Sequence, residues 1–119
     1  MTWVVRFTSD VESWLDELTV KQPDSAEQVI AAIDVLARVG PTLGRPLVDR
    51  IKGSQLTNLK ELRPGSTGRS ELRVLFIFDP ERNAVLLVAG NKAGNWSGWY
   101  RKAIPLAERL YAEHLKSGA

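Results

Sequence analysis

The feature that most constrains the fold is a strongly apolar hairpin sequence, RSELRVLFIFDPERNAVLLVAG, which spans residues 69–90. Its two apolar runs are rich in branched and aromatic side chains, which favour β-strands, and the DPERN segment between them is typical of a turn. Because alternate side chains of a strand share a face, the even-numbered positions from Leu72 to Phe78 should face one way. The odd-numbered positions, with Arg69 and Arg73, should face the other. We therefore expect a sheet that helices cover fully on one face and partly on the other.

Two helices are expected ahead of this hairpin, over residues 9–39. Ser9 with Glu12, and Asp24 with Glu27, have the spacing of helix capping boxes, and apolar residues recur at helical spacing after each pair. A glycine and a proline at residues 40–41 end the pattern. A short strand is expected before the helices, at residues 3–7, and an irregular connection with room for a brief strand after them, at residues 40–55.

The remaining segments complete an α+β fold. A strand over Leu56–Arg63, a turn over Pro64–Gly68 and the two strands of the apolar hairpin form a three-stranded antiparallel meander. With residues 3–7 this gives a four-stranded sheet in all. A C-terminal helix should begin near Ile104 and end near Lys116, because Pro105 fits only the first turn of a helix. We expect a single domain over residues 1–119, since this is a common domain length and no repeat is visible.

The composition excludes several classes of protein. There is no cysteine and one histidine, His114, and neither paired carboxylates nor a known metal-binding spacing occurs. We therefore expect no metal and no cofactor. The N-terminus lacks the pattern of a signal peptide, and the apolar runs are too short to span a bilayer. These features favour a cytoplasmic protein without membrane contact.

The charge is unevenly distributed along the chain. Residues 1–37 carry two basic and seven acidic residues, a net charge of 2 − 7 = −5, whereas residues 38–102 carry twelve basic and five acidic residues, a net of 12 − 5 = +7. A segment this basic is typical of a protein that contacts phosphates or an acidic partner protein. The simpler alternative is a solvated surface of mixed charge.

Five cations on three neighbouring strands are expected to converge on one uncovered patch of the sheet. They are Lys60, Arg63, Arg69, Arg73 and Lys92. Taken alone, Arg73 could simply pair with Glu61 or Glu71. The patch is followed by aromatic residues and a further cation, namely Trp96, Trp99, Tyr100 and Arg101. Cations that bind phosphates, together with aromatic rings that stack on bases, are what single-stranded RNA binding requires.

The order of the expected elements resembles the RelE/ParE toxin superfamily. The stretch LKELRPGSTGRSELRVLFIFDPERNAVLLVAGNKAGNWSGWYRKAIPLAERLYAEHL, residues 59–115, is similar to the HigB-type branch, the phage-derived Gp49-like proteins. The resemblance implies a RelE-like fold. It also implies the toxin of a type II toxin–antitoxin system, a metal-independent endoribonuclease that cleaves mRNA on the ribosome and inhibits translation. Two alternatives stay open: a ParE-like toxin that inhibits DNA gyrase, and a phage-derived interaction protein without catalysis.

The resemblance also implies partners and site residues. The partners would be mRNA, the ribosome and a HigA-type helix-turn-helix antitoxin, with operator DNA bound only through that antitoxin. The catalytic residues would be Lys60, Arg73, Lys92 and Tyr100, while Arg63, Arg69, Trp96, Trp99 and Arg101 are expected to bind RNA. Tyr100, with an ordinary pKa near 10, would be an acid or a stacking platform, and Lys60 a base only if neighbouring cations lower its pKa. The identity of the general base and acid stays open.

Overall fold

A computed structural model describes residues 2–65 and 70–117 of the chain. Its elements are β1 (Val4–Phe7), α1 (Ser9–Lys21), α2 (Pro23–Val39), the 3₁₀ turn η1 (Gly40–Thr42), β2 (Val48–Arg50), β3 (Lys60–Leu62), β4 (Leu72–Phe78), β5 (Asn83–Asn91) and α3 (Trp96–Ser117). The α+β fold class is confirmed. None of the helices in this part of the chain has the length and apolar character needed to cross a membrane.

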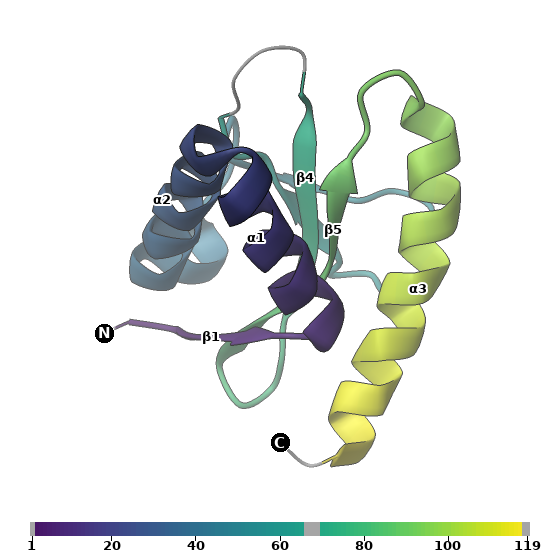
Figure 1. Cartoon of the computed structure of the whole chain (residues 1–119). Coiled ribbons are helices and arrows are strands. Elements are labelled where there is room, and N and C mark those ends of the chain that lie inside the picture. Colours follow the sequence, from purple (N-terminus) through teal and green to yellow (C-terminus); the bar gives the residue numbers. More distant parts are fainter. Residues whose placement is uncertain (1, 66–69, 118–119) are drawn as a thin grey trace.

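The described strands form one five-stranded sheet in the order β1-β5-β4-β3-β2. β1 pairs with β5 in parallel, and the other neighbours are antiparallel. The expected sheet of four strands is one strand short, because the irregular connection contributes β2 at the edge. Helices α1 and α2 cover one face of the sheet and α3 covers the other (Figure 1).

Two hydrophobic cores result from the alternation of side chains along β4. Leu72, Val74 and Phe76 pack with α1 and α2, whereas Leu75 and Ile77 pack with α3. The pairing of β4 with β5 contains one irregularity, where Leu75 lies opposite Val88 and Phe76 lies opposite Leu86. The extra residue of β5, Leu87, is buried in the α3 core. This β-bulge explains why β5 does not alternate strictly.

The helix boundaries differ from those expected at three places. The cap of α1 is Thr8, whose side chain accepts a hydrogen bond from the Val11 backbone N–H, and α2 starts at Pro23 without a side-chain cap. The larger difference is α3, which begins at Trp96 and contains Pro105 in its interior. A proline there costs a backbone hydrogen bond, and the burial of Ala103, Ala107 and Tyr111 on either side of it offsets that cost.

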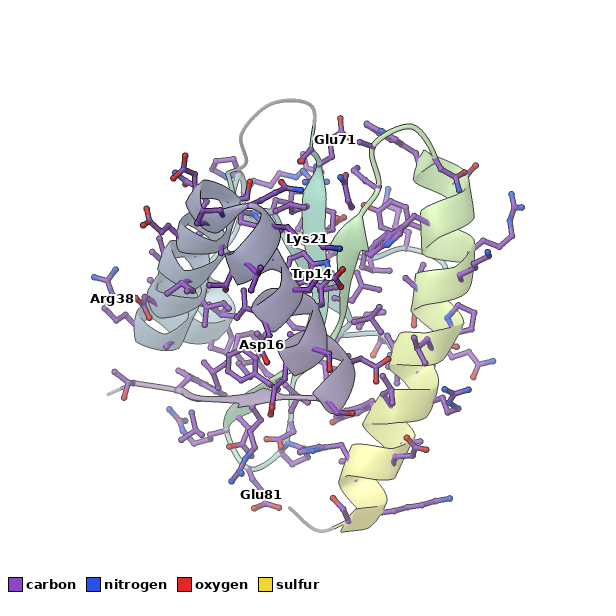
Figure 2. All side chains as sticks on the ribbon, viewed as in Figure 1. Trp14, Asp16, Lys21, Arg38, Glu71 and Glu81 are labelled. Atoms are coloured by element: carbon purple, nitrogen blue, oxygen red, sulfur yellow. The ribbon has the colours of Figure 1, made fainter. Side chains whose placement is uncertain are left out.

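The expected strand over Leu56–Arg63 is also shorter, since only Lys60–Leu62 pairs with its neighbours. The turn expected over Pro64–Gly68 lies partly outside the described residues. Charged side chains cover the outer surfaces of the helical hairpin, where Asp16 of α1 and Arg38 of α2 are both exposed (Figure 2).

Asp79 closes the β4–β5 turn and ties it to the end of α3. Its Oδ1 accepts hydrogen bonds from the backbone N–H groups of Glu81 (3.0 Å) and Asn83 (2.8 Å). Its Oδ2 accepts one from Asn83 Nδ2 (2.8 Å) and lies 2.8 Å from His114 Nε2. Burial by itself raises the pKa of Asp79, but these hydrogen bonds outweigh it, so the pKa lies below the ordinary value of 3.8.

Ionised Asp79 should therefore stabilise the fold in a pH-dependent way. Because its pKa is lower in the folded than in the unfolded chain, the stabilisation is complete above 3.8 and is lost as the pH falls through the folded value. We expect urea unfolding to show a smaller stability difference between the wild type and Asp79→Asn at about pH 3 than at about pH 6. A difference that stays constant or grows on acidification would contradict this role.

Candidate functional site

An open cleft of about 650 Å³ lies between the α3-facing side of the sheet and the start of α3. Its lining residues come from β2 and the segments on either side of it, from β3, from the residues that directly follow β3 and β5, and from α3. They are Arg45, Asp49, Arg50, Ile51, Lys52, Glu61, Arg63, Lys92, Trp96, Tyr100 and Ile104. Five of these are basic and two acidic, so the cleft has the net positive charge that an anionic ligand requires.

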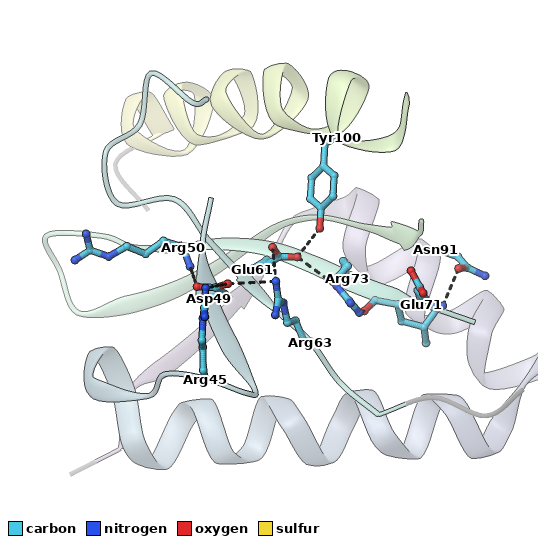
Figure 3. A network of polar contacts seen from close by, with 10 residues as sticks. Arg45, Asp49, Arg50, Glu61, Arg63, Glu71, Arg73, Asn91 and Tyr100 are labelled. Atoms are coloured by element: carbon cyan, nitrogen blue, oxygen red, sulfur yellow. Dashed lines mark hydrogen bonds and ion pairs between the residues drawn. The ribbon is translucent and has the colours of Figure 1, made fainter. Parts of the chain in front are cut away.

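The strand register places the polar side chains of the cleft. Glu61 pairs with Asp49 of β2 and with Leu75 of β4, and Leu75 belongs to the α3 core. These residues therefore share the face that α3 covers. Arg73 lies two residues before Leu75 in β4 and reaches the same face, while Tyr100 projects from the first turns of α3 towards Glu61 (Figure 3).

Glu61 is the centre of a network of charged side chains and is 4% exposed. Its Oε1 accepts a hydrogen bond from the Tyr100 hydroxyl (2.7 Å) and lies 3.3 Å from Arg73 Nε. Its Oε2 lies 3.6 Å from Arg63 Nη2, which is also 3.2 Å from Asp49 Oδ2. Of the two pairings considered for Arg73, the structure contains the one with Glu61. The carboxylate thus fixes two guanidinium groups and one hydroxyl in the same cleft.

Lys92 is 3% exposed and holds a positive charge beside two aromatic rings. Its Nζ lies 3.7 Å from the centre of the Trp96 ring and 5.3 Å from that of Tyr100, as in cation–π contacts. Burial lowers the pKa of Lys92 below 10.5, and the positive charge of Arg73 lowers it further. The ammonium group can therefore release its proton more readily than an ordinary lysine.

The pKa of Tyr100 is shifted in the opposite direction, upwards. Burial, with the hydrogen bond to Glu61 next in importance, raises the pKa of Tyr100 to about 12. At neutral pH its hydroxyl is therefore protonated and acts as a hydrogen-bond donor. This property excludes Tyr100 as a ready base.

The expectation that Lys60 converges with Arg73 and Lys92 is wrong. Lys60 pairs with Phe76, whose side chain belongs to the α1–α2 core, so Lys60 points to the face opposite the cleft. Its Nζ donates a hydrogen bond to the Pro41 carbonyl (3.2 Å) instead. The pKa of Lys60 is indeed lowered, first by burial and then by Arg50, whereas Arg73 and Lys92 are not among the causes. The sequence places Lys60 in the patch only because it lies on a neighbouring strand, and the strand alone does not say which face the side chain takes.

The other residues expected to bind RNA lie in different places. Trp96 is 58% exposed at the mouth of the cleft, whereas Trp99 packs in the α3 core with its indole against Gly90. Arg63 lines the cleft, and Arg101 lines an adjoining groove on the other side of Tyr100. Arg69 lies outside the described residues. The cleft therefore combines Arg63, Lys92, Trp96 and Tyr100, with Arg73 in contact with its Glu61, and it includes neither Lys60 nor Trp99.

Glu61 is the central residue that reasoning from the sequence missed. The sequence indicates Glu61 only as a counterion for Arg73, although its place next to Lys60 on a short strand puts it on the opposite face from that lysine.

Within residues 2–65 and 70–117, no three His, Cys, Asp or Glu side chains gather in a way that could hold a metal ion.

Comparison with known proteins places the chain in a family. The description "Phage derived protein Gp49-like" belongs to the family whose model matches residues 13–112. A Mycobacterium tuberculosis H37Rv protein named as toxin HigB2 is 54% identical over 93% of this chain, and one named as toxin HigB3 is 48% identical over 90%. The chain spans 55% of the length of the first relative and 89% of the second.

A solved structure shares the fold. A mutant of the Escherichia coli toxin RelE in the free state superimposes with a TM-score of 0.63 at 13% identity, over 88% of this chain and 97% of that one. The chain therefore belongs to the phage-derived Gp49-like family, together with relatives named as HigB toxins, and it shares the fold of RelE.

Replacing Glu61 by glutamine tests the network directly. The change removes a negative charge next to the Tyr100 hydroxyl, so the pKa of Tyr100 should fall from about 12 towards 10.0, while burial keeps it above that value. Titration of ¹³Cζ-labelled tyrosines by NMR measures this change. Tyr111 is an internal control, because its raised pKa comes from burial and Asp79. An unchanged Tyr100 titration would show that Glu61 does not control this hydroxyl.

Proposed function

We propose that this protein is the toxin of a type II toxin–antitoxin pair and acts as a metal-independent endoribonuclease on mRNA. The observation that carries the proposal is a positively charged cleft lined by Lys92 and Tyr100, with Arg73 against its Glu61 and an exposed Trp96 at its mouth. Cations that can hold a phosphodiester, next to an aromatic ring that can stack on a base, match a single-stranded RNA substrate.

Binding of the scissile phosphate would use Arg63 and Arg73. A guanidinium group can hold two phosphate oxygens at once and keeps its charge at any physiological pH. Both arginines contact Glu61 in the free protein, at 3.6 and 3.3 Å. An incoming phosphate would therefore accept hydrogen bonds from guanidinium groups that Glu61 already holds in position. Binding would then cost little additional side-chain entropy.

Cleavage would proceed by attack of the 2′-oxygen on phosphorus. The 2′-hydroxyl gives its proton to solvent, its oxygen bonds to phosphorus to form a 2′,3′-cyclic phosphate, and the bond from phosphorus to the 5′-oxygen breaks as that oxygen gains a proton. We assign this last proton to Lys92, whose lowered pKa makes it the better donor, while Tyr100 stays protonated and holds Glu61 and Arg73 in place. Because these groups are weak catalysts of proton transfer at neutral pH, orientation of the mRNA by the ribosome would supply much of the rate.

The partner in this proposal is an antitoxin that covers the cleft. A surface with five basic and two acidic residues would attract acidic side chains, which would exclude RNA from the same cations. As the HigB-type resemblance implies, we propose that this antitoxin is of the HigA type with a helix-turn-helix domain, and that operator DNA binds only to it.

Replacement of Arg73 by alanine should lower RNA cleavage by about 10²–10³-fold, the usual loss when one donor to a developing oxyanion is removed. The comparison variant is Arg38→Ala, which removes an exposed guanidinium on α2, far from the cleft, and should cleave normally. Purified protein with mRNA and ribosomes, followed by mapping of new RNA 5′ ends, provides the measurement. Urea unfolding of both variants confirms that they are folded.

Two results would contradict the proposal. Full activity of Arg73→Ala would remove this arginine from the mechanism. Absence of new 5′ ends with the wild type, together with inhibition of DNA supercoiling by purified gyrase, would favour the ParE-like alternative.

The pH dependence of cleavage tests the role of Lys92. If its ammonium group donates a proton, the rate should fall as the pH rises above its lowered pKa, at a pH below the 10.5 of an ordinary lysine. Lys92→Arg keeps the charge but does not titrate in this range, so it should cleave more slowly and lose this alkaline decline. An unchanged alkaline limb in the variant would assign the titration to another group.

A further inference from the structure

A second pocket lies on the face of the sheet opposite the cleft. It has a volume of about 210 Å³ and is lined by Pro41, Arg50, Thr57, Asn58, Lys60 and Phe78. These residues come from η1, the edge strand β2, the segment before β3, β3 itself and the end of β4. Arg50 is the one residue that this pocket shares with the lining of the cleft, and Phe78 packs at the edge of the α1–α2 core.

The register of β2 and β3 places two cations together in this pocket. Arg50 lies directly opposite Lys60, on the face that Lys60 shares with Phe76. Lys60 is held there by a hydrogen bond from its Nζ to the Pro41 carbonyl (3.2 Å) and lies 5.5 Å from the centre of the Phe78 ring. The Lys60 ammonium group is thus held in place in the pocket, and the exposed Arg50 lies beside it.

No carboxylate neutralises this pair in the part of the chain that the structure describes. All ion pairs found there involve other basic residues, and in the cleft Asp49 and Glu61 balance the arginines. Burial, followed by the positive charge of Arg50, lowers the pKa of Lys60 below 10.5. Two like charges held side by side cost free energy, and a bound anion would remove that cost.

The chemistry of the pocket favours a phosphate group over a carboxylate. The guanidinium and ammonium groups are joined by a hydroxyl (Thr57) and an amide (Asn58), so four side chains able to donate hydrogen bonds line one small space. This suits a tetrahedral anion with several acceptor oxygens better than a planar anion with two. The volume admits a phosphate group with several waters, each of which occupies about 30 Å³.

We propose that Arg50 and Lys60 form a phosphate-binding site on the face of the sheet opposite Glu61, with Arg50 at the border between this site and the cleft. The site goes beyond the proposed ribonuclease function and does not depend on it. Its ligand is a phosphate group, carried either by the backbone of an RNA strand or by a small phosphorylated molecule. In both cases Lys60 contributes to binding and not to catalysis.

Inorganic phosphate tests the site in the wild-type protein. Its addition should shift the side-chain NMR signals of Lys60 and Arg50 with one common saturation curve, whereas Arg38 and Lys102, exposed cations elsewhere, should not follow that curve. The double variant Arg50→Gln/Lys60→Gln should lose this binding. The matched control Arg38→Gln/Lys102→Gln should retain it, and so should Lys60→Arg, which keeps the charge. If the double variant fails to fold, the wild-type signals still decide the matter.

Two further ligands identify the source of the phosphate. A short 2′-O-methyl RNA oligonucleotide cannot be cleaved by 2′-oxygen attack, so its binding is independent of the proposed activity. If an RNA backbone occupies the site, Lys60→Gln, which leaves every residue lining the cleft unchanged, should reduce the slope of log K against log salt by about 0.7, for one lost contact. If adenosine monophosphate shifts Lys60 and the oligonucleotide slope is unchanged, the ligand is a small phosphorylated molecule.

Either of these outcomes supports a phosphate site. The proposal is overturned if none of the three phosphate ligands shifts Lys60 and Arg50. It is equally overturned if a glutamate-rich peptide shifts them and the phosphate ligands do not, because the pocket would then be a contact for an acidic protein.

Discussion

The antiparallel pairing of β4 with β5 is the constraint on which the rest of the structure depends. These two strands are apolar on both faces, so the chain must cover each face with helices, and the alternation along β4 divides the buried side chains into two cores. The helical hairpin α1–α2 covers one face and α3 the other. Because α3 starts beside the end of β3 and the start of β4, its first turns form one wall of a cleft over the polar side chains there.

Charge balance distinguishes the two polar surfaces of the sheet. In the cleft, Glu61 and Asp49 hold Arg63, Arg73 and Arg45 in position, so the site is positive but largely compensated and its donors are pre-oriented. On the opposite face, Arg50 and Lys60 are brought together with no carboxylate of the described residues beside them. The first arrangement suits the selection of a reacting phosphate, and the second suits simple anion binding.

Much of the fold followed from local patterns, and the failures have identifiable causes. The alternation in residues 72–78 gave the correct faces of β4, and the helical spacing in residues 9–39 gave both helices. Pro105 misled the expectation for α3, because packing against β5 outweighs the local cost of an interior proline. Where β2 lies, the sequence predicts an irregular connection with room for a brief strand and no more, because three residues carry too little pattern to specify a strand.

The sequence by itself determined the family and the apolar hairpin. It also determined that Arg73, Lys92 and Tyr100 lie near one end of this hairpin, since all these features depend on local spacing and residue type. Only the tertiary structure decided which cations meet. Side chains of neighbouring residues on β3 point to opposite faces of the sheet. Glu61 therefore lies in the cleft, and Lys60 lies on the other face. That outcome depends on strand register, which is set by long-range packing and is not encoded within a few neighbouring residues.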